Sequence, residues 1–575
     1  MKNTVNVTIN NKEIAVPEET TILQAAKQLG IRIPTLCHME EINEVGVCRI
    51  CVVEVEGAKA LMPSCVTKVT PGMVIRTNTA ATLEARRMVL NLMLASHPKE
   101  CLTCERSGHC ELQTLANEMG ISRLDIDGYD KESELDDSNP SVVRDASKCI
   151  LCRRCVSICS EFQTVAAIGP VQRGIQTRVA PAFDKELGDS TCVLCGQCTS
   201  VCPTGALSEK REIRNVWEAL MDPDKHVVIQ ISPATRVSLG EELGDEPGTI
   251  VTRKMVGALK RVGFDMVFDT DFTADLTIIE EGNEFLKRFK EGGTLPMVTS
   301  CSPGWIRYIE TFYPQLLNHL STCKSPQQMF GAIIKTYYAS KHGIDPATIY
   351  SVSAMPCTAK KAEAARPEMN SSGYRDVDAV LTTRELGQLI REAGVGWNTV
   401  EEADFDAPFG EGTGAGLIFG ATGGVMEAAL RTVVEVVLGR EMPSLDFTPV
   451  RGMEGIKAAE VDLDGTKVRV AAAHGLGNAK ILMDKVAAGE ADFHFIEIMA
   501  CPGGCVGGGG QPQPSTMEKR KKRMDAIYQA ALGLPSRKSH ENPAVQLIYD
   551  EFLQEPLGGC SHRYLHTHYT ARGLE

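Results

Sequence analysis

Cysteines in closely spaced groups are the residues of this sequence best suited to chemistry. The chain has 575 residues and 21 cysteines. Its first residues, MKNTVNVTINNKEIAV, lack the apolar segment of a secretory signal, so we expect a cytoplasmic location and a reducing environment. In that environment grouped cysteines bind metals or take part in redox chemistry more often than they form disulfides. Their spacing indicates which of these they do.

Two runs in the middle of the chain, CILCRRCVSIC and CVLCGQCTSVCP, both have the spacing CxxCxxCxxxC. In two-cluster bacterial ferredoxins this spacing holds two [4Fe-4S] clusters, and the fourth cysteine of each run ligates the other cluster. We therefore predict two [4Fe-4S] clusters here. The expected ligands are Cys149, Cys152, Cys155, Cys159, Cys192, Cys195, Cys198 and Cys202.

Two further groups of metal-ligand residues precede these runs. The first group is Cys37, Cys48, Cys51 and Cys65. One close pair with two isolated cysteines favours a [2Fe-2S] cluster over zinc, which is usually held by two close pairs. The second group is His97, Cys101, Cys104 and Cys110. One imidazole and three thiolates form a full ligand set, for which we expect a third [4Fe-4S] cluster, with a Cys₃His zinc site as the alternative.

In the C-terminal half, three apolar segments rich in β-branched residues end abruptly in cysteine. They are TLPMVTSCSPGW with Cys301, IYSVSAMPCTAKK with Cys357, and FHFIEIMACPGGC with Cys501 and Cys505. The glycines that follow Cys505 let the backbone approach a bulky inorganic group and donate amide hydrogens to it. A phosphate-binding loop is the alternative, but no Lys-Ser/Thr pair follows these glycines. Cys323 and Cys560 stand alone, and we expect them to be inert.

The elements that must position these cysteines indicate a multidomain α+β and α/β protein. Alternation in residues 5–16 predicts a hairpin and residues 20–31 a helix, as in a β-grasp domain. In the C-terminal half, helical segments separate the apolar segments, so cysteines can converge at the carboxyl ends of strands. The expected domains are a [2Fe-2S] ferredoxin-like domain (1–78), a His/Cys₃ cluster domain (79–137), a two-[4Fe-4S] ferredoxin-like domain (138–209) and a large α/β domain (210–575).

Charge and hydropathy exclude two classes of partner. The formal net charge of -14 argues against nucleic acid or an anionic membrane as the main partner. We find no run of eighteen apolar residues, so no membrane span is expected. No nucleotide-binding fingerprint is convincing either, so we expect that the chain does not bind NAD(P) itself.

The motifs TSCSPGW, MPCTAKK and EIMACPGGCVGGGGQP resemble the three signature motifs of [FeFe]-hydrogenases, and the cluster motifs upstream resemble those of the long, multi-cluster members. This resemblance implies reversible H₂ oxidation and proton reduction at an H-cluster in the large domain. The H-cluster is a [4Fe-4S] cubane on four protein cysteines, one of which bridges to a diiron unit with CO, cyanide and a dithiol bridge. Accessory clusters would relay the electrons.

The resemblance also implies roles for individual residues. Cys357, Cys501 and Cys505 would ligate the cubane, with Cys505 bridging to the diiron unit, and Lys360 would donate to a cyanide ligand. The remaining cofactor pocket would include Pro233, Gln327, Met355 and Met499. The proton path would use Cys301, Glu281, Ser321 and Glu284. Taken alone, the methionines could be core filler and the two glutamates a solvated helix face.

At one position the chain departs from the family pattern. Where relatives have two adjacent cysteines, a proton-relay cysteine and then a cubane ligand, this chain has Cys301 followed by Ser302. Either Ser302 ligates iron as an alkoxide and Cys301 keeps the relay, or the loop shifts so that Cys301 ligates and Ser302 relays. A soft thiolate suits iron better, whereas the register before Pro303 favours Ser302 as the ligand. We favour the register-preserving arrangement.

The resemblance implies ferredoxin, or flavin-containing NAD(P)-binding hydrogenase subunits, as electron partners, with H₂ and protons as substrates and maturation proteins that install the cofactor. The first two hundred residues also resemble the large iron-sulfur subunit of NADH dehydrogenases. A non-catalytic or H₂-sensing hydrogenase-like protein is the alternative function. The intact MPCTAKK motif, with Glu281 and Glu284, favours the enzyme.

Overall fold

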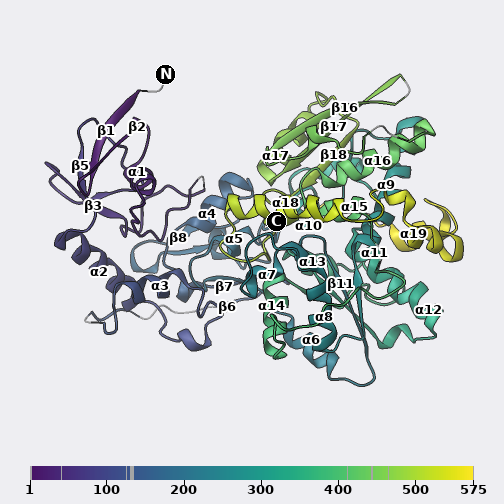
Figure 1. The fold of residues 1–575 in the computed structure, drawn as a ribbon, viewed down its shortest axis with the longest axis horizontal. Helices are drawn as coiled ribbons and strands as arrows, with labels where there is room; N and C mark the ends of the chain where they lie inside the picture. The colour runs from purple at the N-terminus through teal and green to yellow at the C-terminus, as the bar shows by residue number, and fades with distance from the viewer. Residues whose placement is uncertain are drawn as a thin grey trace.

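The computed structural model describes residues 3–40, 42–124, 126–129, 135–410, 412–441, 444–463 and 465–573. Residues 130–134, which belong to the second of the four expected domains, lie outside the described residues. Figure 1 shows a small N-terminal sheet at one end of the molecule, a middle part with short helices and strands, and a large part at the other end. The large part contains two sheets. Among the described residues, no helix combines the length and the apolar character that crossing a bilayer requires.

The N-terminal part is a five-stranded sheet in the order β2-β1-β5-β3-β4 with one helix. Its elements are β1 (Thr4–Ile9), β2 (Lys12–Pro17), α1 (Ile22–Gln28), β3 (Val52–Val55), β4 (Met62–Pro63) and β5 (Val74–Arg76). The turn between β1 and β2 has φ of 47° at Asn10 and 64° at Asn11, the left-handed pair that a two-residue hairpin needs. Thr21 and Gln24 form a capping box at the start of α1. The predicted hairpin and helix are confirmed.

The middle of the chain has short elements around the cysteine motifs. They are α2 (Ala80–Ala95), α3 (Glu111–Glu118), β6 (Leu135–Asp136), β7 (Val142–Asp145), α4 (Arg154–Ser157), β8 (Gly169–Val171), β9 (Arg178–Ala180), α5 (Gln197–Val201) and β10 (Leu207–Glu209). The two CxxCxxCxxxC runs fold alike. In both, a residue with positive φ, Arg153 (62°) or Gly196 (67°), precedes a one-turn helix, α4 or α5, that carries the third cysteine.

The large part contains two separate four-stranded sheets, a division that the sequence did not predict. The first, in the order β12-β11-β14-β15, is parallel throughout. Its strands are β11 (His226–Ile231), β12 (Met266–Asp269), β14 (Ile349–Ala354) and β15 (Ala379–Leu381). The second, in the order β13-β18-β17-β16, is parallel except for β16. Its strands are β13 (Met297–Val298), β16 (Ile456–Leu463), β17 (Thr466–His474) and β18 (Phe495–Met499).

Helix α9 (Asp271–Glu291) contacts the cores of both sheets. Phe272 packs with Phe268 of the first sheet, while Ile278 and Phe285 belong to the core that includes Phe495 of the second. The other helices are α6 (Ile213–Leu220), α7 (Leu239–Glu242), α8 (Thr252–Val262), α10 (Pro303–Phe312), α11 (Pro326–Ile333), α12 (Ala339–His342), α13 (Ala359–Ala364), α14 (Thr383–Glu392), α15 (Gly414–Leu417), α16 (Gly424–Leu438), α17 (Leu476–Ala487), α18 (Met517–Leu532), α19 (Pro543–Ile548) and α20 (Gly559–Leu565). Polar groups on α9 are therefore enclosed between two apolar cores.

Candidate functional site

Strands from both sheets end around one cavity of about 80 Å³. Strands β11 and β14 of the first sheet and strands β13 and β18 of the second sheet all end next to the cavity. The cavity therefore lies where the carboxyl ends of strands converge. The predicted residues that line it are Pro233, Cys301, Ser302, Gln327, Met355, Cys357, Lys360, Met499, Cys501 and Cys505. Three motifs that are far apart in sequence therefore meet at one site.

The thiols in this cavity fit a metal cluster. Burial raises the pKa of Cys505 to about 12. Burial and the neighbouring thiols Cys357 and Cys195 also raise the pKa of Cys501 well above the ordinary value. Thiolates form here only if a cation compensates the cost of burying their charge, and a bound metal supplies that cation. Three thiols with an apolar surround are thus a suitable donor set for an iron-sulfur group.

The glycines after Cys505 are needed for contacts with protein backbone. A Cβ on Gly508 would lie 2.0 Å from the carbonyl oxygen of Pro356, and one on Gly509 would lie 2.5 Å from that of Cys195. We expected these glycines to make room for an inorganic group. In the structure their steric role includes close packing against the loops that carry Cys357 and Cys195.

Two groups hold the Lys360 ammonium at the cavity wall. Its Nζ donates to the carbonyl oxygen of Cys301 at 3.1 Å and pairs with Glu363 Oε2 at 2.8 Å. Gln327 Nε2 also donates to Glu363, at 3.2 Å, while its Oε1 accepts from Ser353 at 2.9 Å. Sequence reasoning missed Glu363. Its position three residues after a functional lysine on a helix was the available signal.

Cys301 and Ser302 have different surroundings. Ser302 caps the start of α10, and its Oγ accepts a hydrogen bond from the backbone N–H of Ala500 at 3.2 Å, directly beside Cys501. The Cys301 side chain is partly exposed to the cavity, and the pKa of its thiol is raised by desolvation and then by the carboxyl group of Glu281. Ser302 therefore lies next to the cysteine-bearing loop after β18, and Cys301 next to a buried acid.

The predicted proton-path residues lie together on and beside α9. Burial raises the pKa of Glu281 to about 8, while the Ser321 hydroxyl opposes the shift and Glu284 adds to it. Ser321 Oγ donates to Glu284 Oε2 at 3.2 Å. Arg288, one turn further along the helix, also pairs with Glu284. Sequence reasoning missed Arg288, although its spacing of four residues from Glu284 marks it as a helix neighbour.

The cysteines of the two ferredoxin-like runs exchange their last members. A second cavity is lined by Cys149, Cys152 and Cys155 of the first run and by Cys202 of the second. Burial raises the pKa of Cys198 most. The neighbouring thiols that raise it further are, from the largest effect to the smallest, Cys192, Cys195, Cys159 and Cys202. Cys202 thus lies with the first three cysteines of the first run, and Cys159 lies near those of the second; the exchange of cluster ligands itself stays a prediction.

The two N-terminal groups differ in burial. All four thiols of the first group, Cys37, Cys48, Cys51 and Cys65, are buried. The Cys51 and Cys65 sulfurs lie 3.2 Å apart, and hydrogen bonds from Cys48 and Cys65 lower the pKa of Cys37. In the second group, Cys101 is exposed, and His97, Cys104 and Cys110 are partly buried.

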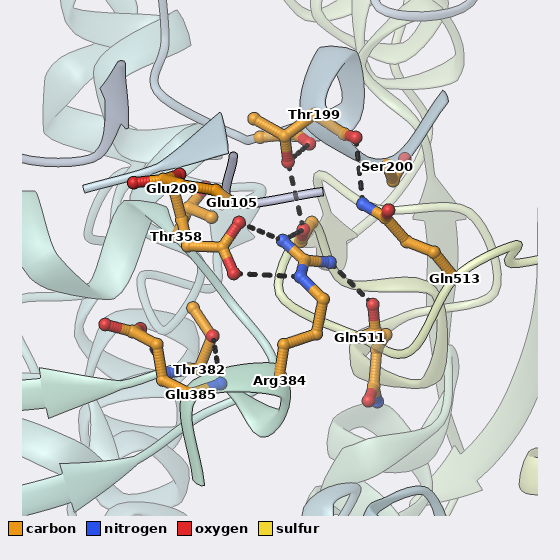
Figure 2. Close-up of polar contacts among 12 residues, drawn as sticks. Glu105, Thr199, Ser200, Glu209, Thr358, Thr382, Arg384, Glu385, Gln511 and Gln513 are labelled. Atoms are coloured by element: carbon orange, nitrogen blue, oxygen red, sulfur yellow. Dashed lines mark hydrogen bonds and ion pairs between the residues drawn. The ribbon is translucent and has the colours of Figure 1, made fainter. Parts of the chain in front are cut away.

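Several polar side chains join the ferredoxin-like part to the cavity loops. Figure 2 shows Arg384 between the carboxylate of Glu209 and the backbone of Gln511. Nη2 of Arg384 donates to Oε2 of Glu209 at 2.7 Å and to the carbonyl oxygen of Gly509 at 2.9 Å. Gln197, between two of the cysteines of the second run, donates to the Gly507 carbonyl at 3.0 Å. The glycine loop is thus tied to the cluster-bearing segment beside it.

Comparison with known proteins agrees with this arrangement. Residues 225–509 match the iron only hydrogenase large subunit, C-terminal domain, and residues 517–572 match the iron hydrogenase small subunit. The chain is 52% identical over 580 residues to the NADP-reducing hydrogenase subunit HndD of Solidesulfovibrio fructosivorans, covering 99% of both chains. It is 42% identical to iron hydrogenase 1 of Clostridium pasteurianum, covering 98% of this chain and 99% of that one.

The chain belongs to the iron-only, or [FeFe], hydrogenase family. Solved structures agree: an [FeFe]-hydrogenase HydA1 variant from Chlamydomonas reinhardtii is 44% identical, with a TM-score of 0.56 over 62% of this chain and 99% of that chain. This hydrogenase also has regions that match a 2Fe-2S iron-sulfur cluster binding domain (2–80), the NADH-ubiquinone oxidoreductase-G iron-sulfur binding region (86–124) and a 4Fe-4S dicluster domain (148–206).

The non-catalytic alternative is not favoured for this hydrogenase. The cytosolic iron-sulfur assembly component 3 of Bos taurus is 33% identical, but the match covers only 61% of this chain. The two relatives described above, which match nearly the whole length, are named hydrogenases. The chain is therefore an enzyme of the family, and its accessory domains indicate an electron relay.

Proposed function

We propose that this hydrogenase interconverts H₂ with protons and electrons at an H-cluster in the cavity between the two sheets. One observation carries the proposal: the thiols of Cys357, Cys501 and Cys505 and the Lys360 ammonium line one cavity. A thiol next to a buried carboxyl group lies on one side of it, and ferredoxin-type cysteines lie on the other. H₂ chemistry needs a route for protons and a route for electrons to the same site, and this cavity adjoins candidates for both.

Cys357, Cys501 and Cys505 are the proposed cubane ligands, with Cys505 as the bridge. When bound, the H-cluster supplies an open iron site and a basic amine, the two features needed to split H₂ heterolytically. Lys360 remains in place through its contacts with Cys301 O and Glu363, so its ammonium can donate to an anionic ligand of the cofactor. The apolar remainder of the wall, including Met355 and Met499, excludes water.

Ser302 is the proposed fourth protein ligand. Its contact with Ala500 N–H holds the hydroxyl beside Cys501, and the register before Pro303 is kept. The neighbouring Cys301 is then free to exchange protons with Glu281. This pairing supports the arrangement favoured from the sequence over the one in which Cys301 ligates iron.

The proposed proton path runs from the Cys301 thiol to Glu281, Ser321, Glu284 and then Arg288. A carboxyl group with a pKa of about 8 both accepts and releases a proton near neutral pH, which suits a relay. Ser321 has one hydroxyl hydrogen and can pass it on as it receives another. Arg288 forms an ion pair with Glu284 at the outer end.

The proposed electron route uses one [2Fe-2S] and three [4Fe-4S] accessory clusters on the ligands named from the sequence. The cluster nearest the cavity would be that of Cys159, Cys192, Cys195 and Cys198, because Cys195 lies close enough to Cys501 to raise its pKa. The relative HndD is named an NADP-reducing hydrogenase subunit. We infer that a separate nucleotide-binding subunit takes electrons from this chain too, with soluble ferredoxin as the alternative acceptor.

The test is an assay of the purified, anaerobically matured chain with H₂. Dye reduction is expected from the chain alone, whereas NADP⁺ reduction is expected only when the native partner subunits are added. Metal analysis is expected to give iron without zinc. Zinc in stoichiometric amount would contradict the His97 assignment, and NADP⁺ reduction by the chain alone would contradict the proposed partner.

A further inference from the structure

A second series of polar groups branches from the proposed proton path at Glu284. Thr322 Oγ1 lies 3.1 Å from Glu284 Oε2 and 2.8 Å from Nδ1 of His566. On the other side of the imidazole, Nε2 lies 3.1 Å from Glu280 Oε2. The side chains of His566 and Glu280 are 1% and 0% exposed. The branch therefore runs through the protein interior, from one turn of α9 to the previous turn.

Glu280 determines which imidazole nitrogen carries a hydrogen. The Tyr549 hydroxyl donates to its Oε1, and the Leu557 N–H donates to its Oε2 at 2.9 Å. Glu280 is the hydrogen-bond acceptor in both contacts. A carboxylate offers acceptors only, so the remaining partner, His566 Nε2, is assigned as a donor as well. Nδ1 is then the nitrogen that gains or loses a proton.

The hydroxyl of Thr322 has a single hydrogen to share between two neighbours. When Glu284 is ionised, Thr322 donates to the carboxylate and accepts from N–H at His566 Nδ1. When Glu284 is protonated, its O–H donates to Thr322, and Thr322 donates to a bare Nδ1. The two states differ only by the shift of two hydrogens along Glu284, Thr322 and His566. The distances from Thr322 Oγ1 to Glu284 Oε2 and to His566 Nδ1 fit either state.

We propose that His566 is a proton-holding side branch of the relay, loaded from Glu284 through the Thr322 hydroxyl. In the step, the O–H bond of Glu284 breaks, Thr322 receives that proton and gives up its own, and an N–H bond forms at Nδ1. A neutral acid and a neutral imidazole become a carboxylate and an imidazolium, so protons and charge balance. His566 does not touch the reacting atoms and acts through Glu284. The inference rests on the proposed proton path.

The groups around His566 set the balance between the two states. The titratable groups that face His566 or its hydrogen-bond partners come from several elements. They are Glu280, Glu284 and Arg288 on α9, Cys323 in the loop before α11, Tyr549 in the segment 549–553, and His562 on α20. Glu280 lies against the imidazole, and Arg288 pairs with Glu284. The exposed ring of His562 stacks on His566 with centroids 4.8 Å apart. Imidazole is the side chain that changes charge near neutral pH, which a reversible proton store requires.

The kinetic test compares pH profiles of kcat for H₂ oxidation in the matured enzyme. Thr322→Val removes the bridging hydroxyl, and His566→Gln removes the proton acceptor. Both are expected to match the wild type at acidic pH and to lose about threefold to tenfold at neutral and alkaline pH, below the 10²–10⁴-fold typical of a group that acts directly on the reacting proton. The double variant is expected to be no slower than either single variant, because both interrupt one branch.

Thr322→Ser keeps the hydroxyl and is expected to keep the wild-type profile, as is His568→Gln at an exposed histidine two residues away. Profiles of Thr322→Val and His566→Gln that superimpose on the wild type would overturn the branch. If Glu281→Gln is inactive in the same series, the main path stands and only the branch is wrong.

A measurement without turnover separates the branch from the enzyme activity. In ¹⁵N-histidine-labelled full-length protein, the His566 resonance is assigned by its loss in His566→Gln. Glu284→Gln is expected to shift the titration midpoint of the His566 resonance. In the Thr322→Val background the same substitution is expected to give a smaller shift. An equal shift in both backgrounds would show that the two groups interact only through space and would overturn the proposal.

Discussion

The side-chain nitrogen Nε2 of Gln163 lies 3.7 Å from the sulfur of Cys195. The same nitrogen donates to the carbonyl oxygen of Ala500 at 3.0 Å, and Oε1 accepts from the backbone N–H of Leu476 at 3.0 Å. One buried amide therefore contacts both a proposed accessory-cluster ligand and the residue before the proposed cubane ligand Cys501.

Gln163→Leu is expected to make the reduction potential of the cluster on Cys195 more negative. Hydrogen bonds to cluster sulfurs stabilise the reduced, more negative state, so their loss disfavours reduction. The measurement is an EPR-monitored redox titration, with Gln176→Leu at an exposed position as the control. An unchanged potential in Gln163→Leu, with the cluster content intact, would show that the amide has only a packing role.

Glu281→Gln is expected to lower turnover in both directions by about 10²–10⁴-fold, the range for a general acid-base group. The amide keeps the size of the side chain but cannot exchange a proton with Cys301. Iron content and the cluster EPR signals are expected to be unchanged. Turnover close to that of the wild type would mean that protons reach the cavity by another route.

Glu281 also predicts a pH dependence of stability. Its folded-state pKa, about 8, lies above the ordinary value of 4.5, so its neutral form is the one that the fold accepts. The stability that the neutral Glu281 side chain contributes is fully present below about pH 4.5 and is lost as the pH rises through about 8. Glu281→Gln is expected to gain thermal stability relative to the wild type between pH 6 and pH 9. A difference that does not vary with pH would contradict the shift.

The proposed roles of Cys301 and Ser302 predict opposite phenotypes. Cys301→Ala is expected to retain the cubane and lose turnover, whereas Ser302→Ala is expected to lose cubane iron. Ser302→Cys is expected to retain the cubane, because a thiolate is a better iron ligand than an alkoxide. EPR and iron analysis before diiron insertion provide the readout. Loss of the cubane in Cys301→Ala alone would reverse the assignment.

Arg384→Met is expected to destabilise the contact between the ferredoxin-like part and the glycine loop. Arg384 lowers the pKa of the buried Glu209 to about 2, although burial alone would raise it. Removing one partner of such a buried pair costs about 3–5 kcal/mol, because the other charge stays buried. Arg384→Met with Glu209→Gln is expected to recover part of the loss in a thermal unfolding assay. No recovery would indicate that the bonds to Gly509 and Gln511 provide most of the stability.

The cysteine spacing and the apolar segments were enough to predict most of the site. Because each of the three segments ends at the carboxyl end of a buried strand, Cys301, Cys357 and Cys501 could be expected to converge. The division into two sheets was not predictable, since strand partners depend on contacts between distant segments such as β13 with β18. Thr322 and His566 were missed for the same reason: they are 244 residues apart and have no motif around them.

The exchange of Cys159 and Cys202 between the two cysteine runs has a consequence for biogenesis. On the proposed ligand sets, each run supplies three cysteines to its own cluster and the fourth to the other, so neither cluster could be completed until both runs have folded together. The segments 149–159 and 192–202 are then a single unit of assembly. We expect a defect in either one to remove both clusters at once, leaving no half-loaded form that could pass electrons to dioxygen.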